Sequence, residues 1–233
     1  MKQRITFISD THTKHGELEL PGGDILIFGG DLMNSGYSQY EIEDFLAWFR
    51  RQDYDFFIFI AGNHDHLFEN NPDLIKELLV GYEDLDYLQD SGIHITNDED
   101  LSDQFLVWGS PWQPEFYNWA FNLPRRGPEL ESKWKEIPEE TKILVTHGPP
   151  QGHLDVSGPP YNEGDLGCEL LRVRVDDIKP MIHVFGHIHG SYGYKFHNGT
   201  HFFNASVLNE RYEIVNKPMT IDWDSISNEI EFK

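Results

Sequence analysis

The sequence contains a single cysteine, Cys168, in 233 residues. No disulfide can form within such a chain, and this cysteine usage suits a reducing compartment. The chain also lacks an apolar run of the roughly 20 residues that a membrane-spanning helix needs. Its N-terminal apolar run is interrupted at Asp10, which is too early for a signal peptide. We therefore expect a cytoplasmic protein with no membrane partner.

Basic residues are scarce as well. The chain has 18 Lys and Arg against 40 Asp and Glu, for a formal net charge of -22. Because nucleic acid backbones are bound through Lys and Arg, this balance argues against long nucleic acid as a partner. The 39% of hydrophobic and 14% of aromatic residues are enough to build a core. The length fits one domain, and no repeat or composition shift divides it, so we expect residues 1–233 to form a single domain.

Five short apolar runs predict the strands of a buried sheet. They cover residues 4–9, 24–28, 56–61, 142–146 and 181–185. Each run is nearly continuous in its apolar residues, which is typical of strands covered on both faces. Further strands are predicted at residues 104–108, 192–196, 200–204 and 219–223.

Helices are predicted between these strands by three start signals. Ser38 and Glu41 form a capping box, and Asn71 with Pro72 gives a cap followed by a first-turn proline. Asp165 is expected to cap a third helix that ends before a proline. The apolar face of that third helix is expected to carry Leu166, Leu170 and Val173. Strands that alternate with helices and then follow one another indicate an α/β fold with mixed sheets.

The segment 110–126 fits neither the helical nor the strand period. It is aromatic and contains three prolines. A loop of this length in a compact domain is usually functional or disordered, and its aromatic content argues against disorder. It either walls a substrate pocket and stacks on an aromatic group, or forms a hydrophobic flap over the sheet.

A polar motif follows each of the five apolar runs. In chain order the motifs are Asp10-Thr11-His12, Gly29-Gly30-Asp31, Gly62-Asn63-His64-Asp65, Thr146-His147-Gly148 and Gly186-His187-Ile188-His189-Gly190. Each motif alone has an ordinary reading as a turn or cap. Together they bring Asp, His and Asn side chains to the C-terminal ends of five strands, where α/β sheets place ligand sites.

The residue types in these motifs point to divalent metal ions. Imidazole, carboxylate and amide ligands without thiolate suit Mn²⁺, Fe²⁺, Zn²⁺ or Mg²⁺. Seven such ligands are too many for one tetrahedral zinc, but they fill two adjacent sites if one carboxylate bridges. Two dications carry more charge than Asp10 and Asp31 neutralise. The resulting positive centre can hold a phosphate group in an otherwise acidic protein.

The motif set resembles that of the calcineurin-like metallophosphoesterases from about Arg4 to Trp223. A closer likeness is to the metallophosphoesterase-domain-containing branch, whose members are phosphodiesterases or nucleotide-binding relatives of them. It rests on Gly109-Ser110-Pro111-Trp112, on residues 119–125 and on Phe203-Asn204-Ala205-Ser206. The resemblance implies two mixed β-sheets in a sandwich flanked by helices.

The resemblance also implies a role for each motif residue. The two metal sites would share the bridging carboxylate of Asp31. The other ligands of the first site would be Asp10, His12 and His189, and those of the second Asn63, His147 and His187. His64 and Asn63 would contact the substrate. His64 and Asp65 are the candidate catalytic residues, and Asp65 would orient this loop.

The expected function is hydrolysis of small phosphodiesters, of cyclic nucleotide or aryl type, by in-line attack of a metal-bound hydroxide. We expect two metal ions per chain, Mn²⁺ first, with Fe, Zn or Mg as alternatives. Trp112 and Arg125 are candidate substrate contacts. The alternative function is a nucleotide-binding regulatory relative with weak or no turnover. A purely structural protein would have no reason to place five such motifs at strand ends. The oligomeric state is left open.

Overall fold

The computed structural model describes residues 2–96, 104–158, 164 and 166–233. Its strands form two six-stranded sheets and one short pair within these residues. The strands of the first sheet are β1 (Lys2–Ile8), β2 (Ile25–Phe28), β3 (Phe56–Phe59), β4 (Leu85–Tyr87), β13 (Met219–Asp224) and β14 (Ile230–Phe232). They lie in the order β14-β13-β1-β2-β3-β4, with β1 to β4 parallel and β13 antiparallel to both of its neighbours.

The second sheet is also mixed. Its strands are β5 (Ser91–Thr96), β6 (Gln104–Ser110), β9 (Thr141–Thr146), β10 (Ile182–Phe185), β11 (Gly193–His197) and β12 (Thr200–Asn204). They lie in the order β11-β12-β10-β9-β6-β5, and the four central strands are parallel. The five strands predicted to be buried are thus central strands of the two sheets.

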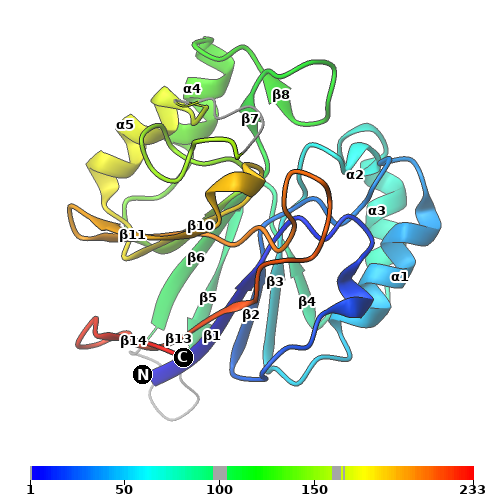
Figure 1. The fold of residues 1–233 in the computed structure, drawn as a ribbon, viewed down its shortest axis with the longest axis horizontal. Coiled ribbons are helices and arrows are strands. Elements are labelled where there is room, and N and C mark those ends of the chain that lie inside the picture. The colour runs from blue at the N-terminus through cyan, green and yellow to red at the C-terminus, as the bar shows by residue number, and fades with distance from the viewer. Residues whose placement is uncertain (1, 97–103, 159–163, 165) are drawn as a thin grey trace.

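Helices cover the outer faces of the two sheets (Figure 1). The helices are α1 (Gln39–Phe49), α2 (His66–Asn70), α3 (Pro72–Leu79), α4 (Pro128–Lys135) and α5 (Glu169–Ile178), and 3₁₀ turns lie at His15–Glu17 and His189–Ser191. The first three helices lie along one side of the sandwich, and α4 and α5 lie on the opposite side. The two mixed sheets flanked by helices are the predicted architecture.

The continuous apolar runs are explained by burial on both faces. In β2, Ile25 and Ile27 point into the core between the sheets, whereas Leu26 and Phe28 pack under the helices of the first side. Ile143 and Leu144 of β9 divide in the same way between the central core and the layer under α4 and α5. Side-chain alternation therefore places apolar residues in two different cores from one strand.

Two helix details in the prediction were wrong. The Ser38 side chain makes no capping bond, and the Glu41 carboxylate instead accepts a hydrogen bond from the backbone N–H of Asn34.

The apolar face predicted for the third helix also differs in the structure. Val173 is 68% exposed, because the buried face of α5 carries Leu171 and Val175. Asp165 lies outside the described residues. The residue before α5 is Cys168, whose sulfur accepts a hydrogen bond from the Leu171 N–H at 3.4 Å. The Asn71 cap of α3 is confirmed.

The segment 110–126 contains regular structure that its sequence did not suggest. β7 (Gln113–Pro114) pairs in parallel with β8 (Asn122–Leu123). Phe121 between them is fully buried, and its backbone N–H donates to the Glu69 carboxylate of α2. The segment is therefore hydrogen-bonded to α2, the helix that follows β3 in the chain. None of the helices among the described residues is long and apolar enough to cross a membrane.

Candidate metal centre

The ends of the central strands meet where the two sheets join. Ser9, directly after β1, pairs with Ser206, which follows β12 of the other sheet. The Ser9 N–H donates to Ala205 O at 2.9 Å, and the Val207 N–H donates to Ser9 O at 3.0 Å. The orange loop after β12 accordingly lies beside the loops that follow β1 and β2 (Figure 1). This junction brings the motifs of both sheets to one place.

A first group of buried ligand atoms belongs to Asp10, His12 and His189. The His189 Nε2 lies 3.5 Å from the Asp10 Oδ1. The His12 Nε2 is buried and has no hydrogen-bond partner among the residues that the structure describes. An unpartnered ring nitrogen beside two further ligand atoms is the arrangement that a metal ion completes.

Asp31 stands between this group and a second one. Its Oδ2 lies 3.6 Å from the His12 Nε2 and 3.4 Å from the His147 Nε2. Its Oδ1 accepts a hydrogen bond of 2.7 Å from the His64 backbone N–H. One carboxylate oxygen therefore faces ligand nitrogens from both sheets.

The second group converges on the side-chain oxygen of Asn63. The His147 Nε2 lies 2.9 Å from it, and the His187 Nδ1 lies 2.7 Å from it. The His147 Nδ1 contacts the Gly29 carbonyl at 2.9 Å and must donate to it, because a carbonyl only accepts. Its Nε2 then needs a proton or a cation to face the oxygens of Asn63 and Asp31. These residues fit a metal ion.

Backbone carbonyls orient the three inward-facing Nε2 atoms. The Nδ1 atoms of His12, His147 and His189 lie 3.0, 2.9 and 3.0 Å from the carbonyl oxygens of Met33, Gly29 and Asn209. A metal-binding histidine typically donates its outer N–H in this way, which fixes the ring and its tautomer. These hydrogen bonds hold the three rings so that each Nε2 faces the carboxylates of the cluster.

The turns that carry these side chains are strained or need glycine. Asp10, Asp31 and His187 have φ of 56°, 61° and 67°, and such conformations cost about 1–3 kcal/mol each and cluster at functional sites. A Cβ on Gly186 would clash with the Asp10 carboxylate, and one on Gly62 would meet the His147 ring at 2.6 Å. The glycines of the motifs therefore leave space for the ligand side chains.

The four buried histidines of the site fall into two pairs, one with raised and one with lowered pKa values. Burial lowers the pKa of His147, but the Asp31 carboxylate outweighs it and raises that pKa to about 9. In the same way, burial of His189 is outweighed by the Asp10 carboxylate, and its pKa is about 9. Burial lowers the pKa of His12 to about 4 and that of His187 to about 3.

His64 lies at the edge of this cluster. One of its ring nitrogens belongs to a possible ligand group with His12 and Asp31. Its Nδ1 donates to the Asn34 carbonyl at 2.7 Å. The Nε2 is then the nitrogen that can exchange a proton with a bound molecule.

Asp65 contacts backbone rather than ligand side chains. Its carboxylate accepts hydrogen bonds from the N–H groups of Asp31, Leu32, Met33 and Gly62. Burial and the neighbouring Asp31 charge raise its pKa to about 8. These are the contacts of a residue that holds the Asp31 and Asn63 loops together.

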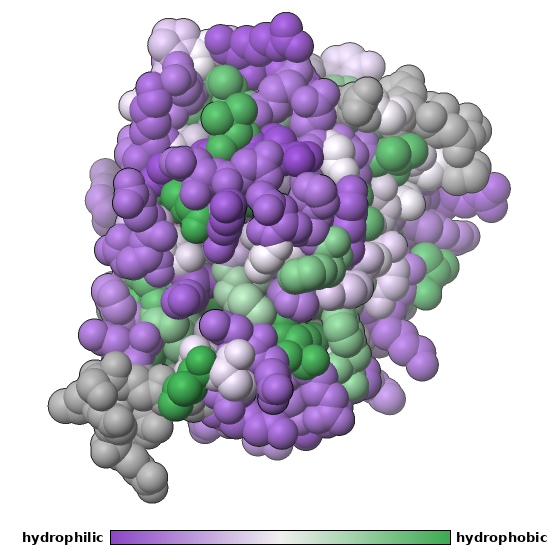
Figure 2. Space-filling view, turned by 90° about the vertical axis from the view of Figure 1, so that its left-hand side faces the viewer, coloured by the Kyte–Doolittle hydropathy of each residue, from purple (hydrophilic) through white to green (hydrophobic). Residues whose placement is uncertain are grey.

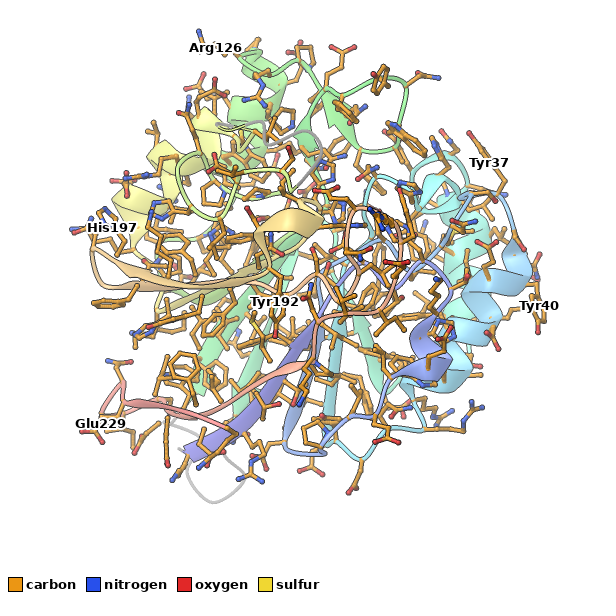
Figure 3. All side chains as sticks on the ribbon, viewed as in Figure 1. Tyr37, Tyr40, Arg126, Tyr192, His197 and Glu229 are labelled. Atoms are coloured by element: carbon orange, nitrogen blue, oxygen red, sulfur yellow. The ribbon has the colours of Figure 1, made fainter. Side chains whose placement is uncertain are left out.

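The two further candidates for substrate contact are engaged elsewhere. The Trp112 Nε1 donates to the Asp90 carboxylate at 2.7 Å, and its ring packs against Phe121. Arg125 donates at 2.8 Å to the Gly167 carbonyl and to the Glu169 carboxylate. The neighbouring Arg126 points outward at the edge of the molecule (Figure 3). The structure does not bring Trp112 or Arg125 into the cluster, and their roles stay predictions.

Three residues of the site had no role in the sequence prediction. The Ser206 hydroxyl donates to the Asp10 Oδ2 at 2.7 Å, and the Asn209 carbonyl accepts from His189. The Tyr212 ring lies edge-on to His12 with centroids 4.8 Å apart. Ser206 ends the Phe203-Asn204-Ala205-Ser206 motif and had a sequence signal. Asn209 and Tyr212 had none, because their loop reaches the site only through the joining of the sheets.

Comparison with known proteins agrees with this site. Residues 3–191 match the Calcineurin-like phosphoesterase family. The chain is 40% identical over 233 residues to the human metallophosphoesterase domain-containing protein 1, covering 94% of this chain and 70% of the relative. The chain therefore belongs to the calcineurin-like phosphoesterases, a class of metal-dependent phosphoesterases.

Two solved structures share the fold at low sequence identity. TT1561 of Thermus thermophilus superimposes with a TM-score of 0.63 and 11% identity, covering 100% of this chain and 99% of that one. The phosphopantetheinyl hydrolase of Mycobacterium tuberculosis gives 0.58 and 17%, covering 89% and 90%. The likeness extends over nearly the whole chain.

Proposed function

We propose that the protein is a phosphodiesterase that hydrolyses small phosphodiesters at a centre for two divalent metal ions, with Mn²⁺ the best activator. The observation that carries this proposal is the position of the Asp31 Oδ2. It lies 3.6 Å from the His12 Nε2 on one side and 3.4 Å from the His147 Nε2 on the other. A carboxylate oxygen between two sets of buried ligand atoms suits a bridging ligand.

Asp10, His12 and His189 would hold one metal ion, and Asn63, His147 and His187 the other, with Asp31 shared. When bound, the metal ions supply Lewis acidity toward a phosphoryl oxygen and lower the pKa of water. The role of the protein is to fix the ligand nitrogens through the carbonyls of Met33, Gly29 and Asn209. His64 protonates the leaving oxygen from its Nε2 while its Nδ1 stays on Asn34.

The charge around the site favours a diester over a monoester. A monoester carries up to two negative charges, and an Arg or Lys side chain beside the metal ions would help to bind it. Arg125 and Arg126 are both bound to the Glu169 carboxylate, at 2.8 and 3.1 Å, and so do not serve this purpose. A small diester with one negative charge, such as a cyclic nucleotide or an aryl diester, needs less positive charge at the site.

The test is a substrate panel with the Mn²⁺-loaded protein. Bis(4-nitrophenyl) phosphate and cyclic nucleotides should be cleaved with kcat/KM at least about tenfold above that of 4-nitrophenyl phosphate, a difference of roughly 1.4 kcal/mol in activation free energy. Preference for the monoester would overturn the diesterase assignment. Tight nucleotide binding without turnover would favour the regulatory alternative instead.

A further inference from the structure

The ring of His64 is held by an aromatic contact from outside the motif set. The Trp119 indole stacks on the imidazole with ring centroids 4.2 Å apart and an interplanar angle of 27°. His12 approaches the same imidazole edge-on, with centroids 4.5 Å apart and an angle of 78°. The Nδ1 bond to the Asn34 carbonyl fixes one ring nitrogen. The imidazole is therefore restricted by a stacked ring, by a crossed ring and by a hydrogen bond.

Trp119 is itself fixed to the loop that carries His64. The Ala120 backbone N–H, one residue later, donates to the Asn63 carbonyl at 3.0 Å. Phe121 is buried and its N–H is bound to Glu69. The Trp119 ring also lies near His66, with centroids 5.8 Å apart. The outer face of this group carries Tyr37, which stacks on His66 at 4.8 Å and is labelled at the α2 side in Figure 3.

We infer that Trp119 is a positioning residue for His64, holding the imidazole so that its Nε2 meets the leaving oxygen of phosphodiesters whose leaving groups are basic alcohols or phenols. This inference rests on the proposed function. In the step concerned, the P–O bond to the leaving group breaks and its electron pair stays on the oxygen. That oxygen takes the Nε2 proton and leaves as the alcohol or phenol. The attacking water supplies the oxygen that replaces it on phosphorus, and one proton of this water passes to the solvent, from which Nε2 is protonated again. Weakly basic leaving groups need no such proton.

The test compares two substrates that differ only in their leaving group. Methyl phenyl phosphate has a basic leaving group, and methyl 4-nitrophenyl phosphate has a good one. Trp119→Ala should lower kcat for the first by about 10–100-fold, part of the roughly 10²–10⁴-fold that a positioned proton donor contributes. The second should change by less than about threefold, with KM nearly constant for both. Trp119→Phe, which keeps a ring face, should retain most of the activity.

A double-variant experiment and a control separate positioning from general damage. In a His64→Ala background, Trp119→Ala should cost nothing further, because Trp119 acts through His64. Phe116→Ala removes an aromatic ring of the same segment that is 55% exposed and contacts Tyr117. It should leave both substrates unchanged. If Trp119→Ala does not fold, Trp119→Leu takes its place, since it keeps apolar bulk without a ring face.

The geometry can also be tested without turnover. In the protein with no metal added, the His64 ring proton signals, identified by their loss in His64→Ala, should be shifted upfield by the indole. The shift should disappear in Trp119→Ala and persist in Trp119→Phe.

The outcomes distinguish this inference from the proposed function. If His64→Ala itself showed no dependence on the leaving group, the proposed proton transfer and this inference would both fall. If His64→Ala showed that dependence but Trp119→Ala slowed both substrates equally, or slowed the His64→Ala protein further, the inference alone would be overturned. An unchanged His64 signal in Trp119→Ala would overturn it as well.

Discussion

At the scale of single residues, the site depends on which nitrogen or oxygen each ligand presents. His12, His147 and His189 all place Nδ1 on a backbone carbonyl, which leaves Nε2 toward Asp10 or Asp31. The sequence motifs predict the residue types at this site because Asp, His and Asn follow buried strands. They do not predict these orientations, since the carbonyls of Met33 and Asn209 come from turns with no periodic pattern.

The first prediction separates His64 from His187. His187→Ala removes a proposed ligand, so metal should bind more weakly and activity should fall, and high Mn²⁺ should restore part of it by mass action. His64→Ala keeps the proposed metal ligands, so activity toward methyl phenyl phosphate, whose leaving group is basic, should drop by roughly 10²–10⁴-fold without rescue. Activity against Mn²⁺ concentration, with metal content measured in parallel, decides between them. If only His64→Ala lost metal and regained activity with added Mn²⁺, the roles proposed for the two histidines would be reversed.

The second prediction is that metal binding competes with protons. The pKa values of His147 and His189 are raised to about 9, so both rings are protonated in the metal-free protein at pH 7. A metal ion must displace both protons, so its affinity should increase from pH 7 to pH 9 and weaken below. Calorimetry at pH 7 in buffers of different ionisation enthalpy should find about two protons released. A pH-independent affinity would contradict this account.

At the scale of helices and strands, continuous apolar runs were the most reliable signal. All five runs became central strands, because β1, β2, β3, β9 and β10 are covered on both faces over most of their length. Weaker patterns were missed: β5 alternates exposed and half-buried residues over much of its length, and β14 is short and largely exposed. The predicted apolar face of α5 was wrong in part. Leu170 packs against the layer under α4 and α5, but Val173 is one of the exposed hydrophobic residues that the sequence cannot tell from buried ones.

The third prediction tests the corrected face of α5. Leu171 is 1% exposed and packs into the layer under α4 and α5, whereas Val173 is 68% exposed. Leu171→Ala should lower the free energy of unfolding by about 2–5 kcal/mol, the usual cost of emptying a core position. Val173→Ala, the matched control, should change it by less than about 0.5 kcal/mol. Denaturant unfolding of both variants measures this, and equal losses would restore the original assignment.

At the scale of the whole molecule, the proposed metal centre would be a positive site within an acidic chain. The net charge is -22, and hydrophilic residues predominate on the face that Figure 2 shows, with small separate apolar patches. Asp10 and Asp31 lie where the two sheets join and are 0% and 2% exposed. The ligand charges are thereby separated from the acidic surface.

The fourth prediction concerns substrate size. Single-stranded DNA should be cleaved at least about tenfold more slowly per phosphodiester than a deoxydinucleoside monophosphate, a small diester with the same leaving alcohol, because the acidic surface repels a polyanion. Added salt should raise the DNA rate relative to the small substrate, since it screens that repulsion. Digestion of DNA as fast as the small diester, at low salt, would show that the acidic residues lie away from the site.

The central claim is that two metal ions make this protein a hydrolase, and metal titration tests it most directly. After chelation and prolonged dialysis the protein should be inactive toward bis(4-nitrophenyl) phosphate. Added Mn²⁺ should restore activity as about two ions bind per chain, with Asp31→Asn impaired in both because the ligand shared between the two sites has lost its charge. Full activity in excess chelator, with no metal in the dialysed protein, would contradict the claim.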